Sequence, residues 1–398
     1  MHKLVLAGMA VALSGCIRTV DAPPPKPPLP SLGPVVTQSL PAQMASLDPS
    51  DSILFWSDER RSAAFRDMES LFPGMEVSPA RHPDDFYPTG SLDAHTAATA
   101  RKFMDETKAA GLMVIKGKKV LFEEYGLGMA RDDRWTSFSV AKSFTSTLLG
   151  AAIRDGHIAS LEVPVTEIIP ALAGTAYDGV TVGQVATMTS GVAWNEDYTD
   201  PQSDVARMLA VAPVAGESQA VTYARTLKRE APAGEKFVYK TLETNLLGLL
   251  VEEATGKSLA AYAAEKIVGP AGFHRSLFWM QDLTGGNIGG CCLSLTLYDY
   301  ARFGQFVLEG GKGVVPDGWF AEAGSPQVDF GNGNGYGYQW WTYPGGFYGA
   351  QGIFGQAITI DPSRKLVVAV ISNWPTATSS ANRAKFQALV RQIALNAP

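Results

Sequence analysis

Short apolar runs of strand length concentrate toward the two ends of the chain. Residues 112–115 and 120–125 flank a Lys-Gly-Lys-Lys turn, and residues 355–360 and 366–371 flank a polar turn at 361–365. Apolar and β-branched runs bounded by turn residues are typical of β-hairpins. The sequence therefore predicts one hairpin near each end of the chain.

Helical spacing of apolar residues marks the neighbouring segments. Residues 94–110 are expected to form a helix that stops at Gly111, and residues 380–395 a closing helix. Between the hairpins, the segment from about 140 to 290 is mostly helical by pattern. This arrangement favours an α+β fold, in which an antiparallel sheet built from both termini is flanked by helices and carries a mainly helical subdomain.

The first sixteen residues have the pattern of a targeting segment. Lys3 precedes an apolar run at 4–13, which is too short to span a bilayer permanently. The run ends in Leu13-Ser14-Gly15-Cys16, which resembles the lipobox of bacterial lipoproteins. We therefore expect a signal peptide over 1–15 and a lipid on Cys16. The alternative is an ordinary secretory signal with an incidental cysteine.

A proline-rich run follows at 23–30. Such runs favour extended polyproline conformation and act as semi-rigid spacers. We expect a tether over 16–45 and a folded domain over 46–398. The residue directly after Cys16 is Ile17 and not an aspartate. In this respect the chain resembles the lipoproteins that are sorted to the outer membrane. The expected location is the bacterial envelope, with the lipid in the outer membrane and the domain facing the periplasm.

The composition and net charge limit the kinds of partner that the chain is expected to bind. The 398 residues are 46% hydrophobic and 18% charged, with a net charge of −6, so the chain has no basic field to attract nucleic acid. Besides Cys16, the only cysteines are the neighbours Cys291 and Cys292. We expect them to be buried small side chains, and a vicinal disulfide is the alternative.

Several common chemistries lack their signatures. The five histidines, at positions 2, 82, 95, 157 and 274, show no metal-binding spacing, and no Gly-x-Ser-x-Gly elbow is present. The glycine-rich segment 331–337 lacks the strand-then-helix setting of a nucleotide loop and is expected to be a turn before a strand.

One pattern that can support nucleophilic catalysis is Ser139-Val140-Ala141-Lys142. Residues three apart share a helix face, so the Lys142 amine can reach the Ser139 hydroxyl. A serine needs a nearby base, and burial turns a lysine into one by lowering its pKa. The apolar helix that follows supplies that burial. The alternative is a serine and a lysine on an ordinary helix.

Further segments place this pattern in context. They are Thr187-Met188-Thr189-Ser190-Gly191-Val192, Tyr239-Lys240-Thr241, Gly335-Tyr336-Gly337-Tyr338-Gln339-Trp340-Trp341 and Ala350-Gln351-Gly352-Ile353-Phe354-Gly355-Gln356. In this order they resemble the penicillin-recognising serine hydrolases, a family that includes class C β-lactamases, related esterases and 6-aminohexanoate-dimer hydrolases. The resemblance covers about residues 50 to 395 and implies a β-lactamase/transpeptidase-like fold.

The resemblance also implies a mechanism. Ser139 attacks a carbonyl while Lys142 and Tyr239 share its proton, with Tyr239 held near ionisation by the lysine ammonium. The backbone N–H groups of Ser139 and Ile353 form the oxyanion hole. Neither a metal nor an organic cofactor is needed.

One departure from the family concerns the strand beside the nucleophile. Penicillin-active members carry a cation there that helps to bind the lactam carboxylate, and this chain has Ala350-Gln351-Gly352 instead. Weak or no β-lactamase activity is therefore expected, and Gln351 and Gly352 are expected to contact substrate.

A loop at 194–200 combines aromatic and acidic residues. Trp194 and Tyr198 are expected to contact substrate, because Tyr198 resembles a loop tyrosine that closes over the amide in the 6-aminohexanoate-dimer hydrolases. A solvated acidic loop is the alternative.

Together these features predict a serine hydrolase that cleaves small amide or ester substrates through an acyl-enzyme on Ser139. The alternative is a non-catalytic surface lipoprotein that uses the same scaffold to bind cell-wall peptide or a partner.

Overall fold

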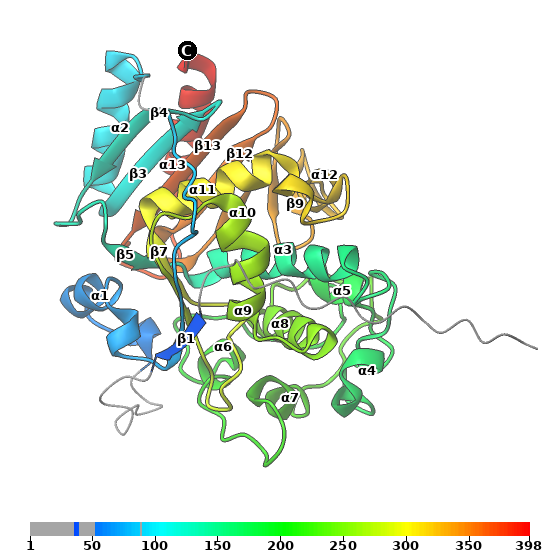
Figure 1. Cartoon of the computed structure of the whole chain (residues 1–398). Coiled ribbons are helices and arrows are strands. Elements are labelled where there is room, and N and C mark those ends of the chain that lie inside the picture. Colours follow the sequence, from blue (N-terminus) through cyan, green and yellow to red (C-terminus); the bar gives the residue numbers. More distant parts are fainter. Residues whose placement is uncertain (1–35, 40–51, 88–89) are drawn as a thin grey trace, which may run out of the picture. The chain divides into compact units, whose positions relative to one another are not determined.

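The hairpins expected at the two ends of the chain meet in one eight-stranded antiparallel sheet. A computed structural model describes residues 36–39, 52–87 and 90–398, all within one compact unit. The strand order is β4-β3-β13-β12-β11-β10-β9-β8, and β13 pairs with β3 along its whole length (Figure 1). The strands are β3 (Ala109–Lys116), β4 (Lys119–Tyr125), β8 (Val328–Gly331), β9 (Asn334–Tyr336), β10 (Trp341–Tyr343), β11 (Phe347–Gln351), β12 (Ala357–Asp361) and β13 (Leu366–Ser372).

Helices cover both faces of this sheet. α11 (Leu297–Leu308) packs on one face, and α2 (Ala94–Glu106) and α13 (Ser380–Asn396) pack on the other. The odd-numbered residues of β13 from 367 to 371 join the core under α11, and the even-numbered residues from 366 to 370 pack with α2 and α13. Because a strand projects successive side chains to opposite faces, β13 is apolar at both sets of positions. The expected fold is confirmed.

The first helix is shorter than predicted. α2 ends at Glu106, Lys108 has a positive φ of 49°, and β3 begins at Ala109. Gly111 therefore lies inside the sheet and does not stop a helix. A Cβ atom on Gly111 would lie 2.7 Å from Cδ2 of Leu297, so glycine is needed there because α11 packs closely against β3.

A second, five-stranded sheet was not predicted from the sequence. Its order is β1-β2-β6-β7-β5, and it consists of β1 (Val36–Ser39), β2 (Gly74–Val77), β5 (Arg134–Thr136), β6 (Leu277–Met280) and β7 (Leu293–Thr296). Strands of three or four residues leave too few alternations to detect in the sequence. β5 leads directly into the segment that carries Ser139.

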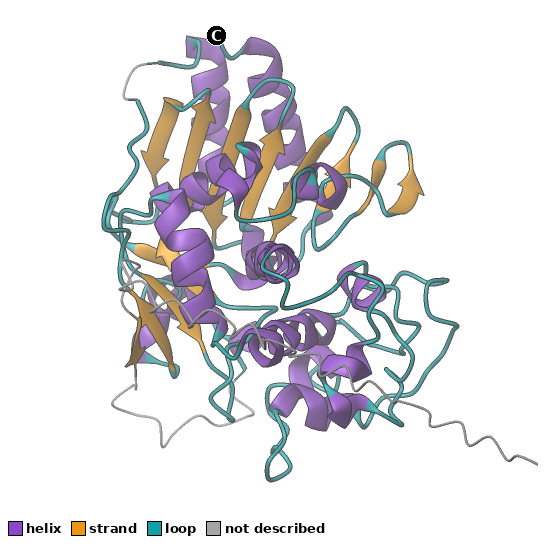
Figure 2. Ribbon diagram, turned by 45° about the vertical axis from the view of Figure 1, so that its right-hand side comes forward, coloured by secondary structure: helices purple, strands orange, loops and turns teal. Residues whose placement is uncertain are grey.

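Between β5 and β6 all the named elements are helical, as the sequence predicted for about 140–290 (Figure 2). They are η4 (Phe138–Val140), α3 (Ala141–Arg154), α4 (Val165–Ile168), η5 (Pro170–Leu172), α5 (Val182–Ala186), α6 (Asp204–Arg207), α7 (Gln219–Ala224), α8 (Thr241–Thr255), α9 (Leu259–Ala263), η6 (Ala264–Val268) and α10 (Gly269–Ala271). The remaining short elements are η2 (Ile53–Phe55), α1 (Asp58–Ala64), η3 (Met68–Ser70), η7 (Gly310–Gly313), α12 (Trp319–Ala323) and η8 (Ile353–Gly355). α3 and α8 pack against each other at the centre of this region.

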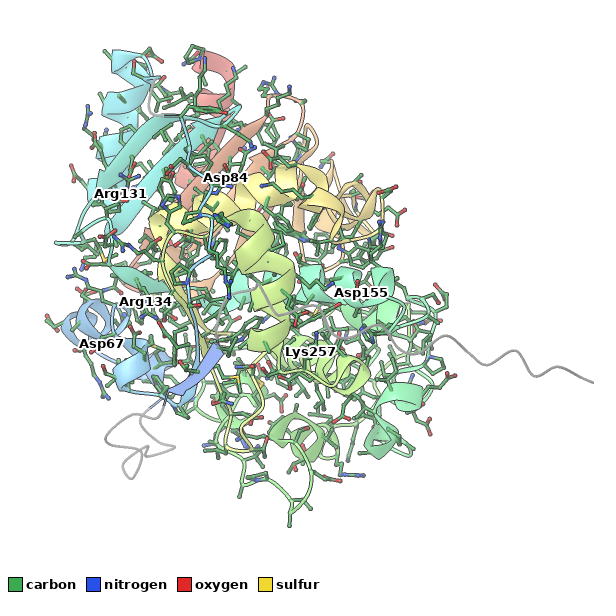
Figure 3. The ribbon with its side chains drawn as sticks, in the orientation of Figure 1. Asp67, Asp84, Arg131, Arg134, Asp155 and Lys257 are labelled. Atoms are coloured by element: carbon green, nitrogen blue, oxygen red, sulfur yellow. A yellow bond between two sulfur atoms is a disulfide. The ribbon has the colours of Figure 1, made fainter. Side chains whose placement is uncertain are left out.

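An ion pair between Asp84 and Arg302 connects the segment before α2 to α11. Asp84, labelled in Figure 3, lies 2.7 Å from Nη2 of the fully buried Arg302. Nζ of Lys312 is 3.2 Å from the same carboxylate oxygen. A buried guanidinium requires such a partner, so this contact fixes the N-terminal segment on the helix layer.

The predicted signal peptide at 1–15, Cys16 and the proline-rich run lie outside the described residues. Across the part of the chain that the structure describes, no helix combines the length and the apolar character needed to cross a membrane.

Candidate active site

Ser139 lies at the junction between the second sheet and the helical region. Ser137 is tied to β7 twice: its N–H donates to the Leu293 carbonyl (2.7 Å), and its Oγ accepts from the Leu293 N–H (2.8 Å). Phe138 then adopts a φ of 43°, a conformation that non-glycine residues rarely take and that clusters at functional sites. The turn places Ser139 just before α3.

Lys142 is buried beneath Ser139, with 1% of its surface exposed. Its Nζ lies 3.3 Å from Oγ of Ser139, 2.9 Å from the Gly290 carbonyl oxygen and 3.1 Å from Oγ1 of Thr241. Burial lowers the pKa of Lys142 to about 8, and the nearby Glu196 carboxylate acts in the opposite direction. Near neutral pH a larger fraction of Lys142 is therefore in the neutral amine form than for an unperturbed lysine, and the neutral amine can accept a proton.

Tyr239 completes the group just before α8. Its side chain lines the same cavity as Ser139, and Nζ of Lys142 lies 5.3 Å from its ring centre. The ring stacks on Trp341 at 5.5 Å. Burial raises the pKa of Tyr239 above its ordinary value, and Glu196 adds to the effect. The structure therefore favours a neutral phenol at Tyr239, which differs from the expectation that Tyr239 is held near ionisation.

Ile353 and Ser139 line the same cavity. Ile353 is the first residue of η8 and Ser139 is the second residue of η4, so both lie in a first helical turn, where backbone N–H groups lack intrahelical partners. Phe354 has a positive φ of 57°, and its ring lies 5.4 Å from that of Phe138. A Cβ on Gly352 would lie 2.6 Å from the Ser137 carbonyl oxygen. Glycine at 352 thus permits the close approach that brings these two turns together.

The cavity at Ser139 has a volume of about 340 Å³. Three of the four residues expected to contact substrate line it: Tyr198, Gln351 and Gly352. Trp194 does not line either of the two described cavities that contain Ser139. Its ring packs edge-on against Tyr223 at 6.0 Å, and its Nε1–H donates to Glu196.

Two charged residues of the cavity were missed as site residues by the sequence reasoning. Glu196 belongs to the acidic loop, and it accepts a hydrogen bond of 2.8 Å from the Tyr198 hydroxyl. Arg383 comes from α13, and its Nη1 is buried without a hydrogen-bond partner among the described residues. Its Nη2 lies 3.4 Å from the Gly352 carbonyl oxygen. A cation is therefore present at this cavity, although Ala350 of β11 does not supply one.

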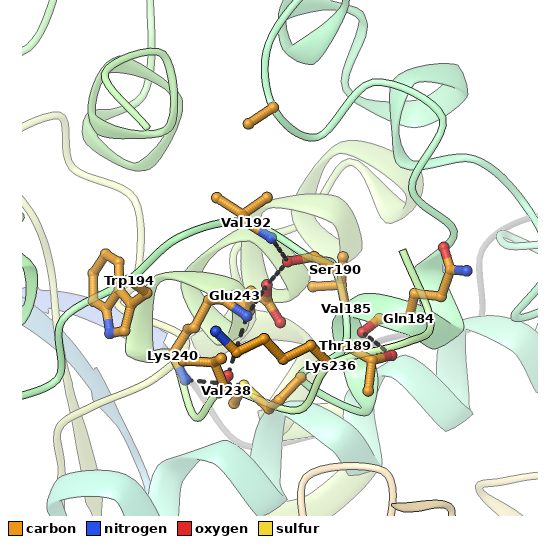
Figure 4. Close-up of polar contacts among 12 residues, drawn as sticks. Gln184, Val185, Thr189, Ser190, Val192, Trp194, Lys236, Val238, Lys240 and Glu243 are labelled. Atoms are coloured by element: carbon orange, nitrogen blue, oxygen red, sulfur yellow. Dashed lines mark hydrogen bonds and ion pairs between the residues drawn. The ribbon is translucent and has the colours of Figure 1, made fainter. Parts of the chain in front are cut away.

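Lys240, Glu243 and Ser190 form a second group of polar side chains, which we call the core cluster (Figure 4). Nζ of Lys240 is 3.2 Å from Oε1 of Glu243, and both side chains are fully buried. Ser190 donates to the same carboxylate oxygen and accepts from the Val192 N–H at 3.1 Å. Burial raises the pKa of Glu243 to about 7, and Lys240 opposes this. Since Lys240 lies between Tyr239 and Thr241 in the chain, the cluster fixes the backbone that presents both residues.

The neighbouring cysteines are joined. Cys291 and Cys292 form a vicinal disulfide, the alternative that the sequence left open. They directly follow Gly290, whose carbonyl oxygen contacts Lys142.

Comparisons with known proteins agree with this geometry. The profile of the β-lactamase family matches residues 96–392. A 6-aminohexanoate-dimer hydrolase from Paenarthrobacter ureafaciens is 32% identical over 339 residues, which cover 78% of this chain and 85% of that protein.

Solved structures share the fold. A proposed 6-aminohexanoate-dimer hydrolase from Bacillus anthracis superposes with a TM-score of 0.77 at 22% identity, over 89% of this chain and 98% of that one. A class C β-lactamase superposes with a TM-score of 0.57 at 15% identity, over 77% and 98% of the two chains. These matches confirm the family and the fold expected from the sequence, and they favour the enzyme over the non-catalytic lipoprotein. The chain belongs to the β-lactamase family and is a serine hydrolase.

Proposed function

We propose that the enzyme hydrolyses amide or ester bonds of small substrates that carry a free carboxylate, through an acyl-enzyme on Ser139. The observation that carries the proposal is the buried Lys142 amine, with its pKa of about 8, at 3.3 Å from the Ser139 hydroxyl. The relative from Paenarthrobacter, named for hydrolysis of the 6-aminohexanoate dimer, supports an amide with a terminal carboxylate.

In the acylation step, Ser139 Oγ attacks the substrate carbonyl carbon and its proton passes to neutral Lys142. The oxyanion that forms accepts hydrogen bonds from the N–H groups of Ser139 and Ile353, a contribution of about 3 to 4 kcal/mol per donor in comparable sites. The C–N or C–O bond then breaks, and the neutral Tyr239 phenol gives its proton to the leaving group.

Deacylation restores all three residues. The Tyr239 phenolate, stabilised by the Lys142 ammonium, takes a proton from water as the water oxygen attacks the acyl-enzyme ester. When the ester bond breaks, Lys142 returns its proton to Ser139. Protons therefore balance over one cycle without any group outside the site.

Arg383 supports the proposal that the substrate carries a free carboxylate. Its Nη1 is buried and has no partner among the described residues, and a buried N–H group of a guanidinium that lacks an acceptor is costly until an anion arrives. β-Lactams also carry a carboxylate, so slow β-lactam turnover is compatible with the site even though the strand cation is absent.

The first test is active-site labelling of the full-length protein with a fluorophosphonate, followed by mass spectrometry, with Ser139→Ala as control. One adduct on Ser139, and none on the variant, is expected. Release of new primary amine from 6-aminohexanoate dimer is measured next, and Arg383→Met should raise KM for the free acid but not for its methyl ester. A folded protein that neither labels nor turns over substrate contradicts the proposal.

We further propose that the enzyme is tethered to the envelope by a lipid on Cys16. The Leu-Ser-Gly-Cys sequence and the proline-rich run behind it support this. Cells fed an alkyne-tagged fatty acid should label the wild-type protein and not Cys16→Ala, and only the wild type should need detergent for extraction from membranes.

A further inference from the structure

Glu196 makes more hydrogen bonds than a solvated loop carboxylate would. It accepts from the Thr241 N–H at 3.0 Å and from the Tyr198 hydroxyl at 2.8 Å. The Thr241 hydroxyl and the Trp194 Nε1–H are also in close contact with it. Four donors from two segments therefore converge on one carboxylate, which also caps the N-terminus of α8.

The contact with Thr241 fixes the direction of a hydrogen bond. An ionised carboxylate can only accept, so the Thr241 hydroxyl must donate its single hydrogen to Glu196. Toward Lys142, which lies 3.1 Å away, the same oxygen can then only accept. Lys142, Thr241 and Glu196 form what we call the site cluster.

The direction matters because a neutral amine has two N–H donors and one lone pair. The Gly290 carbonyl oxygen accepts one N–H of Lys142, and Thr241 accepts the other. The lone pair is then left for the third neighbour, the Ser139 hydroxyl at 3.3 Å. If Thr241 donated to Lys142 instead, the lone pair would be consumed and Ser139 would face an N–H group.

We propose that Glu196 is a positioning residue, which acts through the Thr241 hydroxyl to aim the lone pair of Lys142 at Ser139. The inference rests on the proposed function of Lys142 as the base. It is analogous to the way a carboxylate selects the productive tautomer of a catalytic histidine. Glu196 also supplies negative charge near Lys142, which raises the pKa of the amine against the effect of burial.

The test follows kcat/KM of the full-length protein against pH with a chromogenic ester, together with the rate of fluorophosphonate labelling. Among the described residues, the ionisable groups that face Lys142 are Glu196 and Tyr239. Glu196→Gln should lower kcat roughly 10- to 100-fold, part of the usual contribution of a general base. The acid limb of the pH profile of Glu196→Gln should also lie at lower pH than that of the wild type. The variant removes the negative charge that favours the ammonium form of Lys142.

Asp197→Asn is the matched control. Asp197 belongs to the same loop, and its carboxylate accepts hydrogen bonds from the N–H and the hydroxyl of Thr199. This variant should keep the wild-type acid limb. If Glu196→Gln loses activity while its acid limb stays in place, Glu196 only holds the loop and the inference is overturned.

Thr241 gives a second, independent pair of variants. Thr241→Val removes the hydroxyl with little change in volume and should lower kcat and the labelling rate by a similar factor, whereas Thr241→Ser should restore both to within a few-fold. Wild-type rates in the valine variant, or equal losses in both, would overturn the inference. Failure of the wild type to label at all would instead count against the proposed function.

Discussion

Two clusters that each combine a lysine, a glutamate and a hydroxyl group include residues just after Tyr239 in the chain, Lys240 in the core cluster and Thr241 in the site cluster, and they are connected differently. In the core cluster the lysine and the glutamate are in direct contact at 3.2 Å, and both are fully buried. In the site cluster a hydroxyl stands between the lysine and the glutamate. The first arrangement is an ion pair, and the second is a chain of hydrogen bonds that ends at Ser139.

The difference shows how the protein assigns separate tasks to similar side chains. A directly paired carboxylate offsets part of the cost of burying an ammonium group, which suits a lysine whose task is structural. In the site cluster the Thr241 hydroxyl separates the Glu196 carboxylate from the Lys142 amine. The effect of burial on the pKa of Lys142 therefore exceeds the opposite effect of Glu196, and this pKa falls to about 8. The core cluster holds the backbone, and the site cluster leaves a base available.

The largest expected effect comes from replacing the site lysine. Lys142→Met should lower kcat by about 10³-fold or more, since the variant removes the base. Its free energy of unfolding should change by less than about 2 kcal/mol, because methionine fits a buried site without a charge to desolvate. Steady-state kinetics and urea unfolding measure the two quantities. Activity above a tenth of the wild type would exclude Lys142 as the base.

The same change in the core cluster should have the opposite outcome. Lys240→Met leaves Glu243 buried without its cation, so unfolding should become easier by about 3 kcal/mol at a pH well above 7, where Glu243 is ionised in the wild type. Activity per folded molecule should stay within a few-fold of the wild type. The double variant Lys240→Met/Glu243→Leu should recover much of the stability, because it removes both charges. A cost below 1 kcal/mol for the single variant would show that the pair is not the anchor described above.

Titration should separate the two clusters at different pH values. kcat/KM should decline as pH falls below about 8, where Lys142 becomes protonated. Stability should behave differently, because the pKa of Glu243 rises from 4.5 to about 7 on folding. Between these values the native state binds more protons than the unfolded state, so this group makes the protein less stable as pH rises through the window. The double variant should lack that contribution, and parallel urea titrations of the two proteins test it.

The smallest effect is expected at a nearby surface pair. Lys236 lies 3.0 Å from Glu230, and half of its side chain is exposed. Exposed pairs contribute about 1 kcal/mol or less, so Lys236→Ala should change the free energy of unfolding by no more than that. A larger loss would mean that burial does not explain the contrast between the clusters.

The sequence predicted those parts of the fold that repeat over several residues. The hairpins were found because each joins two apolar runs across a polar turn, and α13 was found because its apolar residues follow the helical period over several turns. The five-stranded sheet was missed because its strands are too short to show a period, and Gly111 was misassigned because a close contact with α11 has no local signal.

The site divides in the same way. Ser139, Lys142 and Tyr239 were predicted from motifs in a recognisable order, and the structure brings all three together. Glu196 and Arg383 enter the site from a loop and from the first turn of α13, where neighbouring residues carry no motif. The raised pKa of Tyr239 depends on burial by Trp341 and its surroundings, which only tertiary structure provides.

The pairing of β3 with β13 has a consequence for how the protein is made. Met113 lies opposite Ala369, so the central strands of the larger sheet cannot pair until nearly the whole chain has been synthesised. Loop closure over such a distance is slow and leaves apolar strands exposed while it is pending. The larger sheet should therefore form only after β13 (Leu366–Ser372) is available to pair with β3. Catalytic activity should appear only on completed chains.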